Sequence, residues 1–369
     1  MSTARAATYD VVIVGGGHNA LVAAAYLARA GRTVVVLERL DHTGGAAVSE
    51  RPWAGVDAKL SRYSYLVSLL PQRIIDDLGL RIELRRRRYS SYTPDPLDPS
   101  RGILVDSADA AATANSFIRT TDDPDEAVRF AAFSERLAPL ASLIFPTMTQ
   151  PLTRASMLRA RLNADALWDD VIERPLGEVL RASLRSDVAQ GIALTDGLIG
   201  TFARSDEATL RQNRCFLYHV IGGGTGHWDV PVGGMGRVTA ELERAARDAG
   251  ADLRTSTEVT AIAPDGEVTI HQAPPLRGRL VLSGVGPAVL AALIRAGGGN
   301  AAADSGTEGA QVKVNMLLRR LPRLHDTTVS PEAAFGGTFH VNETRSHLDR
   351  AYDIAAGGGI PSPLPAAMS

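Results

Sequence analysis

The pattern of apolar and polar positions is most regular near the start of the chain. Val11 to Val14 form a β-branched apolar run, which predicts a buried strand of a parallel sheet. A glycine triplet ends the run, and the Ala-rich segment His18 to Ala30 follows with helical character. Gly31 is placed to close that helix, and a second β-branched run, Thr33 to Leu37, predicts the next strand. The pattern therefore predicts one complete βαβ unit.

The spacing of apolar residues becomes helical from Asp123 and stays mainly helical as far as residue 204. At its start, Asp123 is predicted to cap a helix whose first residue is Pro124, with Glu126 three residues after the cap. Nothing in this stretch indicates a nucleophile or a base. It is best explained as a cap over the first domain, with apolar faces that line a substrate channel.

A glycine-rich loop follows the helical stretch, and after it the strand pattern returns. The loop reaches Gly236 and precedes a helix with Val238 and Leu242 on one face. Strand patterns then recur at 257–259, 267–271 and 280–282. This order predicts that the chain returns to the first domain and completes its sheet.

The glycine triplet has the spacing of a dinucleotide-binding turn. Gly15 permits a tight turn, Gly17 lets the backbone approach a pyrophosphate, and Ala20 is small enough for close packing of helix on strand. Backbone N–H groups at the helix start then face the phosphates. Glu38 ends the second strand, 23 residues after Gly15, where an acid accepts hydrogen bonds from a ribose. The alternative is a Gly-rich turn in an ordinary βαβ unit, with Glu38 facing solvent.

The residues just after Glu38 bear on which dinucleotide is bound. Gly44 and Gly45 resemble the paired glycines that extend the fingerprint in many FAD-binding oxidoreductases, although alone they would be a plain loop. The negative charge of Glu38 also disfavours the 2′-phosphate of NADP. The predicted cofactor is therefore FAD.

Composition sets the broad class of the protein. The chain has 369 residues, enough for two domains, with 45% hydrophobic and 22% charged residues and a net charge of −2. This balance gives no electrostatic case for a nucleic-acid partner. No apolar run is long enough to cross a bilayer, and Met1 to Thr8 is too short for a signal peptide. We expect a cytoplasmic protein, or one of the mitochondrial matrix in a eukaryote.

A single cysteine, Cys215, excludes an internal disulfide and a redox-active dithiol within this chain. We expect it to be a small buried side chain. The histidines, among them His18, His42 and His219, are scattered over unrelated elements, so no metal site is predicted. His227 and His340 are pocket candidates, but a loop or core role fits each of them better.

Three motifs together give the chain a family resemblance: GGGHNAL after the first strand, LE followed by GG after the second, and W-x-x-P-x-G-G-M-G before a helix. The combination resembles the phytoene dehydrogenase-like FAD-dependent oxidoreductases, in the branch named for a pyridine nucleotide-disulfide oxidoreductase domain. The resemblance implies an α/β fold, with a Rossmann-type FAD-binding domain built on a βαβ unit and parallel sheet, and an inserted α+β substrate or cap domain. The FAD-binding domain would comprise residues 1–70 and 226–300, and the substrate domain residues 71–225 and 301–369.

The resemblance also implies which residues hold FAD. The glycine turn would bind the pyrophosphate, Glu38 the adenosine ribose, the paired glycines the ribityl and pyrophosphate region, and Val259 the adenine. The full set of implied cofactor-binding residues is Gly15, Gly16, Gly17, Asn19, Ala20, Glu38, Arg39, Gly44, Gly45, Val259 and Gly284. Pro231, Gly233 and Gly234 would shape the loop between the domains, either as a structural turn or in direct contact with the ligands.

The expected function is hydride or electron transfer between the flavin and an apolar, isoprenoid- or lipid-like small molecule, with peripheral membrane contact. No catalytic residue is assigned, because the flavin supplies the chemistry. The alternatives are an FAD amine oxidase, a non-catalytic prenyl- or lipid-binding protein, and an inactive truncated relative. The last arises because family members continue past the end of this chain and carry a second glycine-rich FAD motif, which is expected to be missing here.

Overall fold

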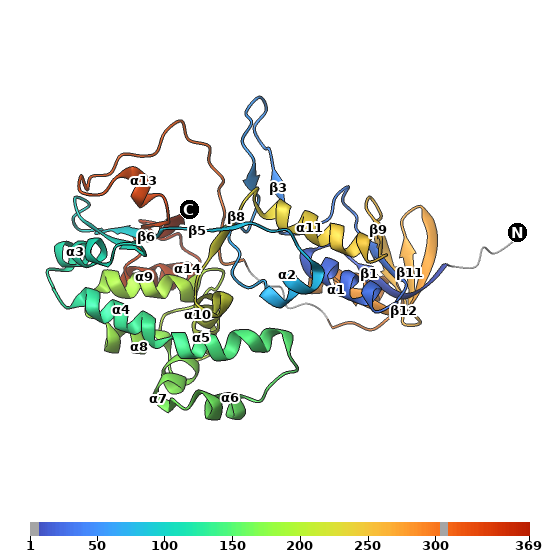
Figure 1. Cartoon of the computed structure of the whole chain (residues 1–369), viewed down its shortest axis with the longest axis horizontal. Coiled ribbons are helices and arrows are strands. Elements are labelled where there is room, and N and C mark those ends of the chain that lie inside the picture. The colour runs from blue at the N-terminus through green and yellow to red at the C-terminus, as the bar shows by residue number, and fades with distance from the viewer. Residues whose placement is uncertain (1–6, 303–308) are drawn as a thin grey trace, which may run out of the picture. The chain divides into compact units, whose positions relative to one another are not determined.

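The computed structural model describes residues 7–302 and 309–369. The chain forms two compact units: unit 1 comprises residues 1–85 and 230–308, and unit 2 comprises residues 86–229 and 309–369 (Figure 1). Residues 1–6, which include most of the segment considered as a signal peptide, lie outside the described residues. The chain thus changes units three times, and its last segment belongs to unit 2.

Unit 1 contains a six-stranded sheet in the order β10-β11-β12-β1-β2-β9. The strands are β1 (Ala7–Val14), β2 (Val34–Leu37), β9 (Asp252–Arg254), β10 (Val259–Ile262), β11 (Glu267–Ile270) and β12 (Ala273–Ser283). Strands β12, β1, β2 and β9 are parallel, whereas β10, β11 and β12 form an antiparallel meander. The predicted α/β class with a parallel sheet is confirmed, and the meander adds an antiparallel edge to it.

The predicted βαβ unit is confirmed. Helix α1 (His18–Arg29) joins the neighbouring parallel strands β1 and β2 and buries small residues such as Ala24 and Ala25. Gly31 has φ +76° and donates its N–H to the carbonyl of Ala28, so it ends the helix as predicted. Because these buried side chains are small, the axis of α1 can lie close to the strands. The short loop between β1 and α1 requires such a close approach.

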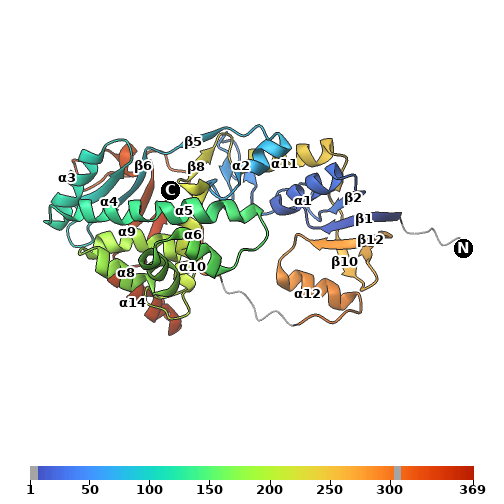
Figure 2. The ribbon, with the colours of Figure 1, turned by 60° about the horizontal axis from the view of Figure 1, so that its bottom comes forward.

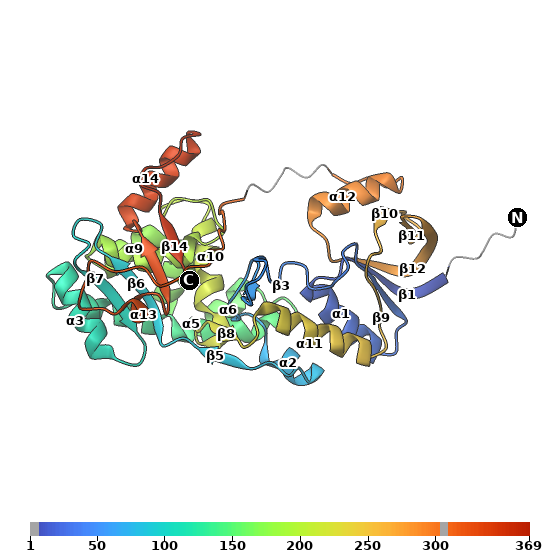
Figure 3. The ribbon, with the colours of Figure 1, turned by 90° about the horizontal axis from the view of Figure 1, so that it is seen from above.

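Helices cover both faces of this sheet. Val11 and Ile13 of β1 pack in one apolar cluster with α1 and α11 (Met235–Asp248), which contact each other along their length (Figures 1 and 3). Val12 and Val14 face the other way, into a cluster with residues of α12 (Pro287–Ala296) (Figure 2). Alternate residues of one strand therefore form two separate cores, because successive side chains of a strand point to opposite faces.

Helix α2 (Gln72–Leu78) also belongs to unit 1, whereas the sequence analysis assigned residues from 71 onward to the inserted domain. Leu78 and Leu80 are buried in the same cluster as α1 and α11. The helix ends at Gly79, which has φ +59°. The apolar residues of α2 thus connect it to the first sheet, and its sequence alone did not indicate which core they join.

Two further two-stranded sheets are present, one within unit 1 and one where the chain changes units. Strands β3 (Ser49–Glu50) and β4 (Leu60–Ser61) form one pair. Strands β5 (Leu84–Arg86) and β8 (Asp229–Pro231) form another two-stranded sheet at two of the three places where the chain changes units.

Unit 2 has a four-stranded sheet in the order β14-β13-β6-β7, in which only the β13–β6 pair is parallel. Its strands are β6 (Tyr89–Pro94), β7 (Gly102–Asp106), β13 (Thr338–Val341) and β14 (Ala366–Met368). Its helices are α3 (Ala110–Thr121), α4 (Glu126–Arg136), α5 (Ala138–Ile144), α6 (Ala155–Leu162), α7 (Asp165–Trp168), α8 (Leu176–Ser183), α9 (Asp187–Leu198), α10 (Arg211–Val220), α13 (Pro331–Ala334) and α14 (Arg345–Ala356), with short helical turns η1 (Phe145–Thr149), η2 (Asp169–Glu173) and η3 (Gly222–Gly224). The predicted helical character of the insert is therefore observed together with a separate sheet.

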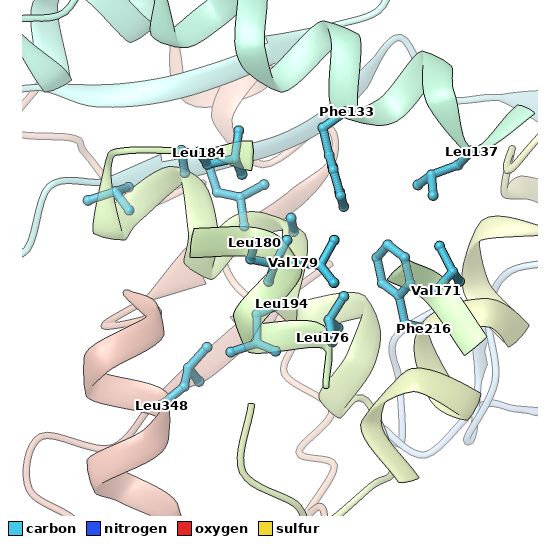
Figure 4. Packing of buried hydrophobic residues seen from close by; sticks show 14 of the residues in the cluster. Phe133, Leu137, Val171, Leu176, Val179, Leu180, Leu184, Leu194, Phe216 and Leu348 are labelled. Carbon is cyan, nitrogen blue, oxygen red and sulfur yellow. The ribbon is translucent and has the colours of Figure 1, made fainter. Parts of the chain in front are cut away.

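The main core of unit 2 lies among its helices. Figure 4 shows Phe133 of α4, Leu180 of α8, Leu194 of α9 and Phe216 of α10 converging on one another. Burial of each such side chain stabilises the fold by roughly 1.5–3 kcal/mol. The helical spacing of apolar residues after Asp123 is explained by this core.

The start of α4 differs from the prediction. The helix begins at Glu126, and Pro124 lies in the turn before it. The Glu126 carboxylate is fully buried, where it accepts hydrogen bonds from the backbone N–H groups of Arg185 and Ser186. Because Glu126 bonds to a distant segment, it does not complete the predicted capping box at Asp123.

Unit 2 also buries two titratable side chains next to each other. His340 of β13 shares a hydrogen bond of 2.8 Å between its Nδ1 and Thr93 Oγ1, and Glu343 Oε2 accepts one of 2.8 Å from Thr195 Oγ1. Burial lowers the pKa of His340 to about 4 and raises the pKa of Glu343 to about 7. Both groups are therefore uncharged between these values, and the 3.9 Å approach of His340 Nε2 to Glu343 Oε2 is not an ion pair there.

The buried acid predicts a pH dependence of stability. The folded state holds a proton on Glu343 that the unfolded state releases above its ordinary pKa of 4.5, so the free energy of unfolding falls as the pH rises towards and through 7. Between pH 5 and pH 8 the contribution of Glu343 to the free energy of unfolding falls by about 2.5 kcal/mol. Urea denaturation of Glu343→Gln should lack this contribution, whereas the exposed control Glu135→Gln should keep it. As the pH rises, the free energy of unfolding of the control should therefore fall relative to that of Glu343→Gln. The same pH dependence in both variants would contradict the assignment. His340 acts in the opposite direction over an overlapping range, lowering stability as the pH falls from about 6.5 to 4 in every variant that keeps it, so its effect cancels when the two variants are compared at the same pH.

Candidate functional site

The turn between β1 and α1 leaves no room for a side chain. Gly15 has φ +93°, and a Cβ on it would lie 2.8 Å from Val285 Cγ1 and 3.0 Å from the carbonyl carbon of Gly284. Its N–H donates to the carbonyl of Leu37 at 2.8 Å, which fixes the turn to the end of β2. Glycine is therefore required at this position both by backbone conformation and by close packing.

Gly284 lies against the same turn from the end of β12. Its N–H donates to the carbonyl of Val14 at 2.7 Å, and a Cβ on it would lie 2.6 Å from the Gly15 oxygen and 3.0 Å from Ala20 Cβ. Ala20 itself is buried in the first turn of α1. Three of the predicted site residues, Gly15, Ala20 and Gly284, are thus brought into direct contact by strand pairing.

The paired glycines after β2 also contact the turn. Gly44 forms an isolated parallel bridge with Gly17, and its N–H donates to the carbonyl of Gly16 at 2.8 Å. Gly44 has φ +120°, and a Cβ on Gly45 would lie 3.0 Å from the Cα of Gly17. The two glycine motifs, far apart in the sequence, therefore form one side-chain-free surface.

Glu38 is buried at the end of β2 and is joined to the turn. Its Oε2 accepts a hydrogen bond of 2.7 Å from the Gly16 N–H, and its Oε1 accepts one of 2.9 Å from the Leu40 N–H. The alternative of a solvent-facing Glu38 is therefore wrong. Each carboxylate oxygen keeps further acceptor capacity, so the predicted contact with a ribose is compatible with these bonds.

The start of α1 is open to a phosphate. Its N-cap, Gly17, provides no side-chain hydrogen bond, and the space beside it is open except for the Gly284 oxygen at 4.0 Å. Unpaired N–H groups at a helix start, together with the helix dipole, favour an anion. The residues present thus fit a dinucleotide pyrophosphate.

The remaining predicted cofactor residues surround this surface. Asn19 is exposed in the first turn of α1, and Arg39 is exposed directly after Glu38. Val259 begins β10, two residues after Thr257, whose N–H donates to the Glu38 carbonyl at 2.8 Å. The structure therefore places Val259 two residues after a backbone contact with Glu38, and its contact with adenine stays a prediction.

Several supporting residues were missed by the sequence analysis. Ser49 and Ser61, from the β3–β4 pair, accept hydrogen bonds from the N–H groups of Gly236 and Met235 at the start of α11. A Cβ on Gly234 would lie 2.8 Å from Ser49 Oγ, and Gly234 N–H donates to the Pro231 carbonyl at 3.0 Å. The Pro231–Gly234 segment is therefore a structural turn, and no local sequence signal linked it to these serines.

No residue of unit 2 is assigned a catalytic role. Cys215 is buried, as expected, and its thiol donates to the Ile199 carbonyl at 3.1 Å. His340 is a core residue and His227 lies on an exposed loop, which confirms the roles that fitted each of them better. Among residues 7–302 and 309–369, no group of three or more His, Cys, Asp or Glu side chains is arranged to hold a metal ion. Within the same residues, no helix is both long enough and apolar enough to cross a membrane.

Comparison with known proteins agrees with the geometry of unit 1. Residues 13–72 match the model of an NAD(P)-binding Rossmann-like domain. An uncharacterized protein of Mycobacterium tuberculosis is 50% identical over 369 residues, a match that covers 97% of this chain and 68% of that protein. Pyridine nucleotide-disulfide oxidoreductase domain-containing protein 2 of Rattus norvegicus is 30% identical, with the same coverage of 97% and 68%.

A solved structure of putrescine oxidase shares the fold. The two align with a TM-score of 0.51 at 17% sequence identity, covering 78% of this chain and 60% of that structure. This chain therefore spans less than two thirds of that protein, and the likeness concerns the fold alone.

The glycine contacts predict a graded effect of adding a methyl group. Gly44→Ala forces an unfavourable φ and places Cβ 2.8 Å from Val48 Cγ1, so we expect it to lower the free energy of unfolding by about 3 kcal/mol. Gly31→Ala, which has φ +76° and no atom within 4 Å of the new Cβ, should cost only about 1 kcal/mol. Urea denaturation of both variants tests this, and equal losses would contradict the close packing of Gly44.

Proposed function

We propose that this chain, which belongs to the family of pyridine nucleotide-disulfide oxidoreductase domain-containing protein 2, transfers hydride between FAD and an apolar, isoprenoid- or lipid-like substrate. The chain is an FAD-dependent oxidoreductase. The observation that carries the proposal is the side-chain-free surface of Gly15–Gly17 and Gly44–Gly45, with the Glu38 carboxylate buried beside it.

The residues of unit 1 divide the binding of FAD among them. N–H groups at the start of α1 bind the pyrophosphate, and Glu38 accepts hydrogen bonds from the adenosine ribose. Gly44 and Gly45 let the cofactor lie against the backbone. When bound, FAD supplies the hydride-transfer chemistry. The protein supplies the orientation of cofactor and substrate, so an acid–base pair is not required for the proposal.

The apolar substrate is supported by the resemblance to phytoene dehydrogenase-like enzymes. Peripheral membrane contact and a cytoplasmic or mitochondrial-matrix location remain predictions. An amine-oxidase activity is the alternative, since the fold is shared with putrescine oxidase.

The cofactor proposal predicts a visible flavin spectrum. The purified chain, reconstituted with FAD, should bind close to one equivalent, as measured by absorbance before and after heat release. Glu38→Ala should raise the Kd for FAD roughly tenfold to a hundredfold, because it removes the ribose acceptor and leaves the Gly16 N–H without its partner. Glu267→Ala, an acid on β11 in the same unit, is the matched control and should bind FAD as the wild type does. A folded wild type that takes up no FAD would refute the proposal.

The substrate class can be tested separately on the FAD-loaded chain. Mixing it without oxygen with an isoprenoid polyene is expected to bleach the visible flavin band, because the flavin becomes reduced as it takes a hydride. Primary amines should leave the band unchanged. Bleaching by amines alone, with peroxide release in air, would replace the proposed substrate with the amine-oxidase alternative.

A further inference from the structure

One buried hydroxyl of unit 1 has no hydrogen-bond partner among the described residues. Ser68 is only 7% exposed, and its Oγ is unpaired. Burying a hydroxyl without a partner costs roughly 1–3 kcal/mol. An apolar residue at this position would avoid that cost, so the hydroxyl requires an explanation.

The segment that contains Ser68 belongs to a buried cluster next to the paired glycines. The preceding residue, Val67, packs in a buried cluster with Ala47, Met235 and Val238. Ala47 donates its N–H to the Gly44 carbonyl at 3.0 Å. Two contacts therefore connect the Ser68 segment to the glycine surface, on the side of the paired glycines.

The other hydroxyls around this cluster have partners. Thr239 Oγ1 donates to the Ala47 carbonyl at 2.9 Å. Ser49 Oγ accepts from the Gly236 N–H at 2.9 Å, and Ser61 Oγ accepts from the Met235 N–H at 3.0 Å. Each of these groups has a structural role in holding α11. Ser68 has none, although it is buried to a similar degree or more.

We propose that Ser68 is a further FAD-binding residue, whose Oγ hydrogen-bonds a ribityl hydroxyl of the bound cofactor. The inference rests on the proposed function. In the proposed function the turn at Gly15–Gly17 binds the pyrophosphate and Glu38 binds the adenosine ribose. A polar group on the side of Gly44 would therefore contact the part of FAD beyond the pyrophosphate, which is the ribityl chain. A polyol fits this position because a hydroxyl both donates and accepts hydrogen bonds, as Ser68 does.

The test compares FAD with ADP, which carries the adenosine and phosphates but lacks the ribityl chain and the flavin. The full chain is freed of cofactor and titrated with each ligand, followed by flavin fluorescence for FAD and by calorimetry for ADP. Ser68→Ala is expected to raise the Kd for FAD about tenfold, as loss of one hydrogen bond does, and to leave the Kd for ADP unchanged. Thr120→Ala is the matched control, because Thr120 is an equally buried and unpaired hydroxyl in unit 2. It should change neither value.

The cofactor-free proteins provide a second measurement. If Ser68 has no structural partner, the free energy of unfolding of Ser68→Ala should equal or exceed that of the wild type. Unchanged FAD affinity in Ser68→Ala would overturn the inference and leave the proposed function intact. An equal loss of FAD and ADP affinity would also overturn it, since the effect would then be structural. A wild type that binds no FAD would refute the proposed function and this inference with it.

Discussion

Direct backbone contact between two glycine segments is the constraint on which unit 1 depends. Gly44 bridges Gly17, and a Cβ on Gly45 would approach the Cα of Gly17 to 3.0 Å. A Cβ on Gly16 would likewise lie 3.2 Å from Glu38 Cβ. A side chain at Gly16 or Gly45 would therefore press on the end of β2 or on the start of α1. The arrangement of the central strands and the dinucleotide surface therefore have one physical origin.

The same contact explains how the protein combines stability with binding. Within the turn, backbone groups that would otherwise need water are satisfied: the Gly15 N–H by Leu37 and the Gly16 N–H by Glu38. At the start of α1 there is no side-chain cap, so the N–H groups there are left available to an anion. The turn is thus held by its own hydrogen bonds, while the helix start is left for a ligand. The buried carboxylate of Glu38 has both a structural and a binding role. Its oxygens accept the hydrogen bonds that hold the turn, and they retain capacity to accept further hydrogen bonds from a ligand.

In unit 2, unlike unit 1, buried polar side chains connect elements that are distant in sequence. Glu126 of α4 receives the N–H groups that precede α9, and Glu343 receives the Thr195 hydroxyl of α9. Burial makes Glu343 sensitive to pH, since it disfavours the charged form and raises the pKa of the carboxyl group. No local motif indicates the partners of these two acids, because helix packing and not local spacing decides which groups meet.

The sequence by itself determined the βαβ unit, the end of α1 at Gly31, and the residues of the glycine turn, because each depends on local periodicity and backbone freedom. Tertiary structure alone decided that α2 joins the first core, that β12 extends from Ala273 through two prolines to pair with β1, and that Ser49 caps α11. It also decided that Gly44 lies on Gly17 and that Ser68 is buried without a partner. Such contacts join segments far apart in the chain, and only the folded arrangement brings them together.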